Sequence, residues 1–361
     1  MRHELLKRFA SLTAFKIMQS VPHKRKRIES LYVLKAICAY FVVSIHVMRP
    51  QEILMFLSGI GTPCFLCITG YLLYSSDRER ELNKCTTWAQ KSFWLTVVCG
   101  IIYSIATYFF HDRNVLTQGL VFHLKNLLLG MQICGYLWYL TALWQALLLL
   151  WVIIKYVPRL LNFLPFLFIV AYIFRNYNSE IFLFESITIS PTVLRNTCVC
   201  TSLPFLATGY LIHKHHERIL KQINVHLWFA ITLVLAFSEF HIRRASGYTC
   251  SHFLLFTYPL IVLSMLLCIK HQSFTLPILG TIGKHHSPNI YYFHGLFIWT
   301  LNVVGCPEWN LLVVTACIYC ACIPCSYAYN FFSKLWIEHI WLRFKELIAT
   351  AYTKLKIQTP S

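Results

Sequence analysis

Long apolar runs separated by short polar segments make up the chain from residue 31 onward. A helix of about 20 mostly apolar residues crosses a hydrocarbon core of about 30 Å. An additional apolar run at 119–133 is shorter, so we predict it to be interfacial or re-entrant. The pattern therefore predicts an all-α protein, a polytopic transmembrane helix bundle of about ten spans. The predicted spans are 31–48, 53–75, 92–111, 136–156, 160–175, 193–213, 226–242, 252–269, 287–304 and 309–332.

The basic residues favour one orientation of these spans. If the N-terminus is inside, 24 of the 32 Lys and Arg residues fall on the inner side, and seven fall outside. Cytoplasmic loops of membrane proteins carry such an excess. An eleventh span would place the basic loop 214–225 and the C-terminal tail outside. We therefore predict cytoplasmic N- and C-termini. Segment 1–30 would be a basic cytoplasmic segment, 31–332 the transmembrane domain, and 333–361 a basic amphipathic tail on the membrane surface.

Composition excludes a soluble domain, because 57% of the residues are hydrophobic and only 13% are charged. The net charge of +18 is spread over many short segments, so we predict membrane lipid and no nucleic acid as a partner. Most of the 15 cysteines lie within apolar runs, where Cys behaves as a small apolar residue. Pairs such as Cys64 and Cys67 have zinc-ribbon spacing but would lie on apolar helices rather than on turns. We therefore predict neither a metal site nor disulfides.

Ionisable residues inside membrane spans are costly and mark candidate functional sites. Lys35 and His46 are 11 residues apart, close to three helical turns, so both side chains lie on one helix face, roughly 16 Å apart. A cation near the inner side and an acid/base group near the outer side would suit an elongated ligand such as a nucleotide-linked pantetheine arm. The alternative is structural: Lys35 snorkels to the inner headgroups, and His46 marks the outer interface.

Five stretches resemble membrane-bound acyltransferase family 3, the integral-membrane O-acyltransferases, and they follow the family's order. In RIESLYVLKAICAYFVVSIHV, Lys35 and His46 have the spacing of the family's Arg or Lys and its His. In LGTIGKHHSPNIYYFHGLFI, His294 lies at the position of another family His. The other three stretches are GTPCFLCITGYLLY, NLLLGMQICGYLWYLTALW and PFLATGYLI. The chain departs from the family at Tyr32, where an acidic residue is usual, and at Trp94, where a second basic residue is usual.

The resemblance implies an enzyme, an O-acetyltransferase or related acyltransferase of a bacterial inner membrane. It would move an acyl group, in the simplest case acetyl, from cytoplasmic acyl-CoA to a hydroxyl of a cell-surface or lipid-linked carbohydrate. Acyl-CoA is then a co-substrate, and no bound cofactor is expected. His46 would be a general base or transient acyl carrier. The other expected catalytic residues are Glu52, Glu239 and His294, and the donor-binding residues are Lys35, Lys91, Trp138, Tyr139 and Arg195.

Other interpretations of these residues and of the whole chain are open at this point. His294 would equally well form a hydrogen bond to a neighbouring helix, and Arg195 would anchor the sixth span at the outer surface. Trp138 and Tyr139 also fit the aromatic belt of a membrane interface. The protein itself could be a transporter or flippase, or a non-catalytic membrane component of polysaccharide assembly. The absence of an internal repeat disfavours the transporter.

Overall fold

The structure is a computed structural model that describes residues 28–47, 55–110, 136–176, 181–184, 187–189, 197–246, 254–304 and 310–335. This part of the chain is helical apart from one pair of short strands. Its elements are α2 (Glu29–Val47), α3 (Met55–Ser58), α4 (Gly61–Leu73), α5 (Arg78–Phe110), α7 (Trp138–Tyr156), the 3-10 turns η2 (Pro158–Asn162) and η3 (Leu164–Phe166), α8 (Leu167–Asn176), β1 (Ile181–Phe184), β2 (Ile187–Ile189), α10 (Cys198–Thr201), α11 (Leu203–Gln222), α12 (Val225–Ala245), α13 (Thr257–Lys270), α14 (Pro277–His285), α15 (Ser287–Val304) and α16 (Leu311–Leu335).

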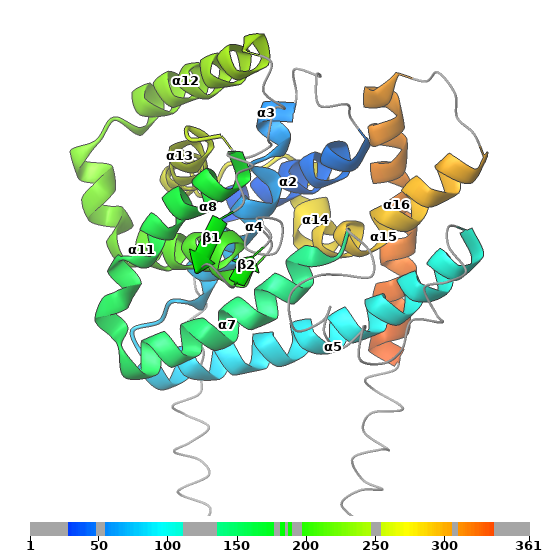
Figure 1. The fold of residues 1–361 in the computed structure, drawn as a ribbon, viewed down its shortest axis with the longest axis horizontal. Coiled ribbons are helices and arrows are strands. Elements are labelled where there is room, and N and C mark those ends of the chain that lie inside the picture. The colour runs from blue at the N-terminus through cyan, green and yellow to red at the C-terminus, as the bar shows by residue number, and fades with distance from the viewer. Residues whose placement is uncertain are drawn as a thin grey trace, which may run out of the picture.

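Helices α2 and α4 form the interior of the bundle (Figure 1). Helix α2 contacts α3, α4, α13, α14, α15 and α16, and α4 packs most extensively against α11. In the apolar window of Phe56–Leu73, 72% of the residues are buried, against 22% in α12 and 28% in α5 and α16. The outer helices therefore turn apolar side chains outward, as expected of a protein whose solvent is lipid.

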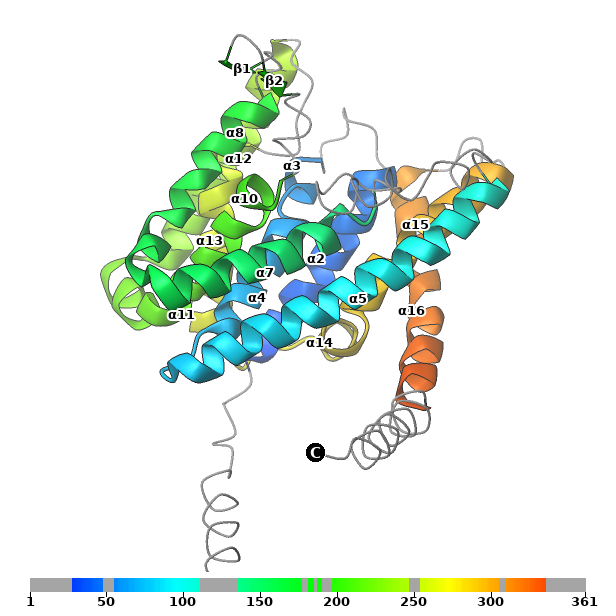
Figure 2. The ribbon, with the colours of Figure 1, turned by 60° about the horizontal axis from the view of Figure 1, so that its bottom comes forward.

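Helices α5 and α7 run side by side across one face of the bundle (Figure 2). Helix α5 has 33 residues, so at about 1.5 Å per residue it is about 50 Å long. It begins at Arg78, which means that most of the predicted cytoplasmic loop 76–91 is helical. Trp94, Ile101 and Phe109 are exposed on α5, as lipid-facing side chains would be.

In the described part of the chain, six helical segments are long and apolar enough to cross a membrane: α2, Phe56–Leu73, α5, α7, α12 and α16. Each overlaps a predicted span, and the protein is a multi-pass membrane protein. The predicted spans 160–175 and 252–269 contain shorter apolar helices, Leu164–Ile173 and Thr257–Lys270. Helix α11 overlaps the predicted span 193–213, and α15 coincides with 287–304. The count of ten spans and the side of the termini remain predictions.

Prolines explain why several predicted spans are interrupted. Pro63 has no N–H to donate to the carbonyl of Gly59, so α4 begins after a break that separates it from α3. The first bond of α4 runs from the Cys64 N–H to the Ile60 carbonyl, at 2.9 Å. Pro158 and Pro165 each lie at the start of a 3-10 turn, which leaves only ten residues for α8. Pro204 likewise lies at the start of α11.

Two other features differ from the pattern of apolar runs. Helix α11 continues to Gln222, so much of the basic segment 214–225 is helical. Strands β1 and β2 form an antiparallel pair in which Ile181 lies opposite Ile189. Strand β1 is rich in Ile and Phe and β2 in Ile and Thr, all of which favour strands. The segments 1–27, 119–133 and 336–361, with their predicted surface roles, lie outside the described residues.

Glycines allow the interior helices to approach closely. A Cβ on Gly70 of α4 would lie 2.0 Å from the Leu206 carbonyl oxygen of α11, and one on Gly209 of α11 would lie 1.9 Å from the Cys67 carbonyl oxygen. A Cβ on Gly283 of α14 would lie 1.7 Å from the Tyr32 carbonyl oxygen of α2. Small residues at helix crossings are typical of membrane bundles, where close van der Waals packing drives association. These crossings fix the positions of α2 and α4, which line the cavity described next.

Candidate active site

His46 and His294, two of the predicted catalytic residues, lie together. His46 is in the last turn of α2, and His294 is in the middle of α15. Their rings stack with centroids 5.2 Å apart and an interplanar angle of 29°. The ring of Tyr136, just before α7, meets both edge-on, at 4.8 Å from His46 and 5.7 Å from His294. Three helices that are distant in sequence therefore converge on one pair of imidazoles.

The hydrogen bonds of His294 determine which ring nitrogen is available for chemistry. Its Nδ1 lies 2.7 Å from the backbone carbonyl oxygen of Tyr291, which can only accept. The neutral ring therefore carries its hydrogen on Nδ1 and a lone pair on Nε2. The side chain is fully buried, and Nε2 has no hydrogen-bond partner among the described residues. Such a nitrogen is suited to accept a proton from a hydroxyl group.

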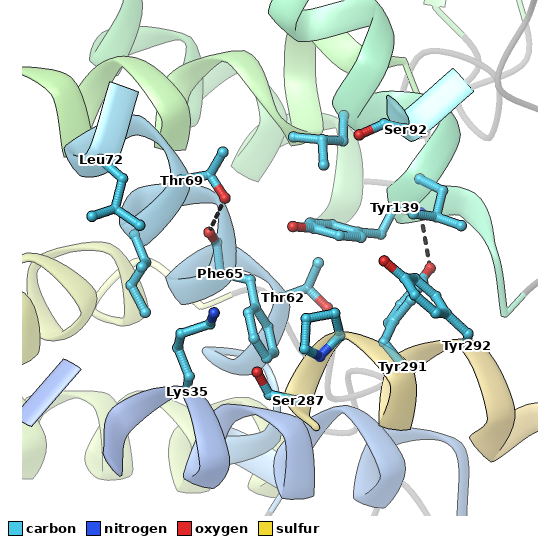
Figure 3. Close-up of a pocket in the computed structure, with 14 residues that line it drawn as sticks. Lys35, Thr62, Phe65, Thr69, Leu72, Ser92, Tyr139, Ser287, Tyr291 and Tyr292 are labelled. Carbon is cyan, nitrogen blue, oxygen red and sulfur yellow. Dashed lines mark hydrogen bonds between the residues drawn. The ribbon is translucent and has the colours of Figure 1, made fainter. Parts of the chain in front are cut away.

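A cavity of about 140 Å³ lies between α2, α4, α5, α7 and α15 (Figure 3). Among the described residues that line it, only Lys35 is charged. The Lys35 ammonium and the Tyr139 hydroxyl point into it from opposite walls. The lining residues are Lys35, Thr62, Phe65, Ile68, Thr69, Leu72, Ser92, Tyr139, Leu140, Leu143, Ser287, Pro288, Tyr291 and Tyr292. One cation and several hydroxyl groups in an otherwise apolar chamber suit an elongated ligand with anionic or carbonyl groups.

The hydroxyl groups of the cavity are linked to its walls. The Thr69 hydroxyl donates to the Phe65 carbonyl at 2.8 Å, and the Tyr139 hydroxyl points into the cavity from α7. Tyr291 separates the cavity from the histidine pair, because it lines the cavity while its ring lies 5.7 Å from that of His294. Lys35 and His46 both lie on the side of α2 that faces α15. This agrees with the shared helix face expected from their spacing.

The other predicted donor-binding residues are placed as follows. Tyr139 lines the cavity, whereas Trp138 begins α7 and is half-buried. Lys91 is exposed on α5 and is not a lining residue, although its neighbour Ser92 is. Arg195, like the predicted catalytic residue Glu52, lies outside the described residues.

Glu239, one of the expected catalytic residues, is hydrogen-bonded just before α13 begins. Its carboxylate accepts hydrogen bonds from the backbone N–H groups of Leu255 at 2.8 Å and Phe256 at 3.0 Å, just before α13 begins. Tyr172 donates a further bond to it at 3.3 Å. A carboxylate is stabilised at a helix N-terminus by the unpaired N–H groups and the helix dipole. These bonds connect α12 to α13 and give Glu239 a structural role, so the expectation that it orients His46 receives no support.

Sequence reasoning did not assign a role to Tyr136, Tyr291 or Ser287. Tyr136 and Tyr291 lie within stretches that resemble the acyltransferase family, so a signal was present. The three-residue spacing of Tyr291 and His294 also predicts a contact on one helix face. The sequence gives no sign that Tyr136 contacts the face of α15 that carries Tyr291 and His294. The described cysteines are free thiols, and no group of three or more His, Cys, Asp or Glu in the described part could hold a metal.

A family model described as an acyltransferase domain matches residues 28–331, which include the histidine pair and the whole cavity. The chain therefore belongs to this family of membrane-bound acyltransferases, and the resemblance predicted from the five stretches is confirmed. Searches of curated proteins and of solved structures gave no match. Membership defines the class of reaction as acyl transfer, and the apolar helices place it in a membrane.

Proposed function

We propose that the protein transfers an acyl group, in the simplest case acetyl, from acyl-CoA to a hydroxyl group of a cell-surface or lipid-linked carbohydrate. The observation that carries this proposal is the stacked pair His46 and His294, which Tyr291 separates from the cavity that contains Lys35. An imidazole pair beside a chamber whose described lining contains one cation, Lys35, suits a base that works on a bound thioester.

In the proposed reaction, the donor enters from the cytoplasmic side. Its phosphates bind basic groups near the inner helix ends through charge-assisted hydrogen bonds. Lys35 and Lys91 are the candidates for these groups. The pantetheine arm runs along α2 toward His46, about three helical turns away. Tyr139 lines this path, and Trp138 and Arg195 are the further candidates for holding the donor.

The chemical step exchanges a thioester for an oxygen ester. A sugar hydroxyl gives its proton to an imidazole nitrogen while its oxygen attacks the thioester carbonyl. The C–O bond forms, the C–S bond breaks, and the proton passes to the sulfur of CoA. His46 acts as this base or takes up the acyl group itself before passing it to the sugar. The unpaired Nε2 of His294 supports a role for the second ring in the same proton transfer.

The proposed topology is ten spans with both termini in the cytoplasm of a bacterial inner membrane. The distribution of Lys and Arg between the two sides supports it. In this orientation Lys35 lies toward the cytoplasmic donor and His46 toward the outer acceptor. The acyl group, rather than the carbohydrate, would therefore cross most of the membrane.

The proposal is tested with purified protein in liposomes, with radiolabelled acetyl-CoA on the face that exposes the 76–91 segment. Lipid-linked oligosaccharides are supplied as acceptors, and empty liposomes and liposomes with His46→Ala protein serve as controls. Protein-dependent appearance of label in the lipid-linked fraction supports acyl transfer. If acetyl-CoA is not consumed and the oligosaccharide instead changes leaflet, the protein is a flippase and the proposal fails.

A further inference from the structure

Helix α7 begins without a cap from its own sequence. The residue at its N-cap is Leu137, whose apolar side chain accepts no hydrogen bond and is buried. The first N–H groups of a helix have no partner within the helix, and a buried N–H without an acceptor is costly. Ser, Thr, Asp or Asn usually supplies that acceptor. In α7 it must come from another part of the molecule.

Tyr291 of α15 supplies it. Its hydroxyl oxygen accepts a hydrogen bond from the Tyr139 N–H at 3.2 Å, and its hydrogen is donated to the Tyr136 carbonyl at 2.6 Å. The Tyr139 ring lies edge-on to the Tyr291 ring at 5.1 Å. A tyrosine hydroxyl has one hydrogen and spare acceptor capacity, so both of its functions are used here. The hydroxyl therefore ties α15 to residues 136–139.

The same tyrosine fixes the surroundings of both imidazoles. Its backbone carbonyl accepts the Nδ1 hydrogen of His294 and thereby leaves Nε2 as the free lone pair. Its hydroxyl holds the backbone of Tyr136, whose ring contacts His46 and His294. Loss of the hydroxyl would release the segment before α7 and, with it, the aromatic wall against which both rings pack.

We propose that Tyr291 is a positioning residue: its hydroxyl caps α7 so that Tyr136 holds the His46–His294 pair in place for acyl transfer. The inference rests on the proposed function for its catalytic consequence. Its structural part, the immobilisation of the imidazole pair, can be measured without any acyl acceptor. Loss of the Tyr291 hydroxyl should therefore lower turnover more than donor binding, because Lys35, the cation in the cavity, is unchanged.

The test is Tyr291→Phe, which removes the hydroxyl and keeps the ring. Tyr258→Phe is the matched control, because its hydroxyl bonds to Thr208 between α13 and α11, away from the cavity. We expect Tyr291→Phe to lower kcat by about tenfold or more, as a misplaced catalytic group does, with the KM for acetyl-CoA within about twofold of wild type. Equal kcat losses in both variants, or a loss confined to KM, would overturn the proposal.

A second measurement reads the position of the histidines directly. Diethyl pyrocarbonate labels accessible neutral imidazoles, and mass spectrometry gives the labelling rate at each histidine. We expect faster labelling of His46 or His294 in Tyr291→Phe, with His241 on α12 unchanged in the same sample, and no such change in Tyr258→Phe. Unaltered rates at both rings would refute the positioning role. If wild-type protein transfers no acyl group but the rates change, the proposed function fails while the positioning role stands.

Discussion

The close crossing of α14 over α2 leaves no room for a side chain at Gly283. In Gly283→Ala, the new Cβ would lie 1.7 Å from the Tyr32 carbonyl oxygen and 3.1 Å from the Ala36 backbone nitrogen. Both neighbours are backbone atoms of α2, so no side chain can swing away. Helix α14 must move by about 1.8 Å before this contact relaxes to an ordinary separation of about 3.5 Å.

This movement has two measurable consequences. Overpacking of this kind costs about 1–3 kcal/mol of stability, against which the better helix propensity of Ala recovers up to about 1 kcal/mol. Helix α14 also leads through His286 directly into Ser287 and Pro288, which line the cavity beside Lys35. We therefore expect a lower apparent melting temperature and a higher KM for the acyl donor.

The measurements are fluorescence-detected thermal unfolding in detergent and donor titration of acyl transfer. Gly100→Ala is the matched control, since a Cβ at this α5 position meets nothing within 4 Å. Replacing a helical glycine in open space should be neutral or should stabilise by about 0.5–1 kcal/mol. If Gly283→Ala behaves like Gly100→Ala in both assays, the two helices are not in backbone contact and the reasoning is wrong.

Three further predictions concern charge, pH and topology. Lys35→Ala should weaken acyl-CoA binding, measured by calorimetry, by about 1.5–3 kcal/mol, the value of a charged hydrogen bond. Lys35→Arg should retain most of the binding free energy. Equal binding by both variants and the wild-type protein would contradict a role for the cation. Burial lowers the pKa of His286, whose Nδ1 hydrogen-bonds Ser326. Its stabilising contribution is therefore complete above the ordinary value of about 6.5 and is lost as the pH falls through the lower folded-state pKa. The melting temperature should fall more between about pH 7.5 and 5.5 in wild type than in His286→Gln, and identical slopes would refute this. Cysteines placed at Arg80 and Arg218 in a cysteine-free background should react with an impermeant reagent only in opened cells, and reaction in intact cells would overturn the proposed orientation.

The pattern of apolar runs predicted the bounds of α15 and α7 most closely. The predicted span 287–304 coincides with α15, and 136–156 nearly coincides with α7. The run 160–175 reads as one span by hydropathy alone, yet Pro165 divides it. Helices α5 and α11 extend beyond the apolar runs into polar, charged sequence, which hydropathy alone does not assign to a helix.

The candidate site could be predicted one helix at a time but not as an assembly. The 3.6-residue period places Lys35 and His46 on one face of α2, and it relates Tyr291 to His294 on α15. It carries no information on which faces meet. Contact between His46 and His294, and the capping of α7 by Tyr291, depend on helix crossings that close glycine contacts permit. Glu239 was a candidate to orient His46, but the sequence gives no sign that its carboxylate accepts hydrogen bonds from Leu255 and Phe256.

The central claim is that His46 and His294 act together in acyl transfer, and a double-mutant measurement of kcat tests it most directly. His46→Ala, His294→Ala and the double variant are compared with His241→Ala, which removes a histidine far along α12. Loss of a general base costs about a hundredfold or more. Residues that act as one unit give non-additive losses. We predict that each single variant loses about that much, that the double variant is no slower than the slower single one, and that His241→Ala keeps full activity. Full activity in His46→Ala, or losses that multiply in the double variant, would contradict the claim.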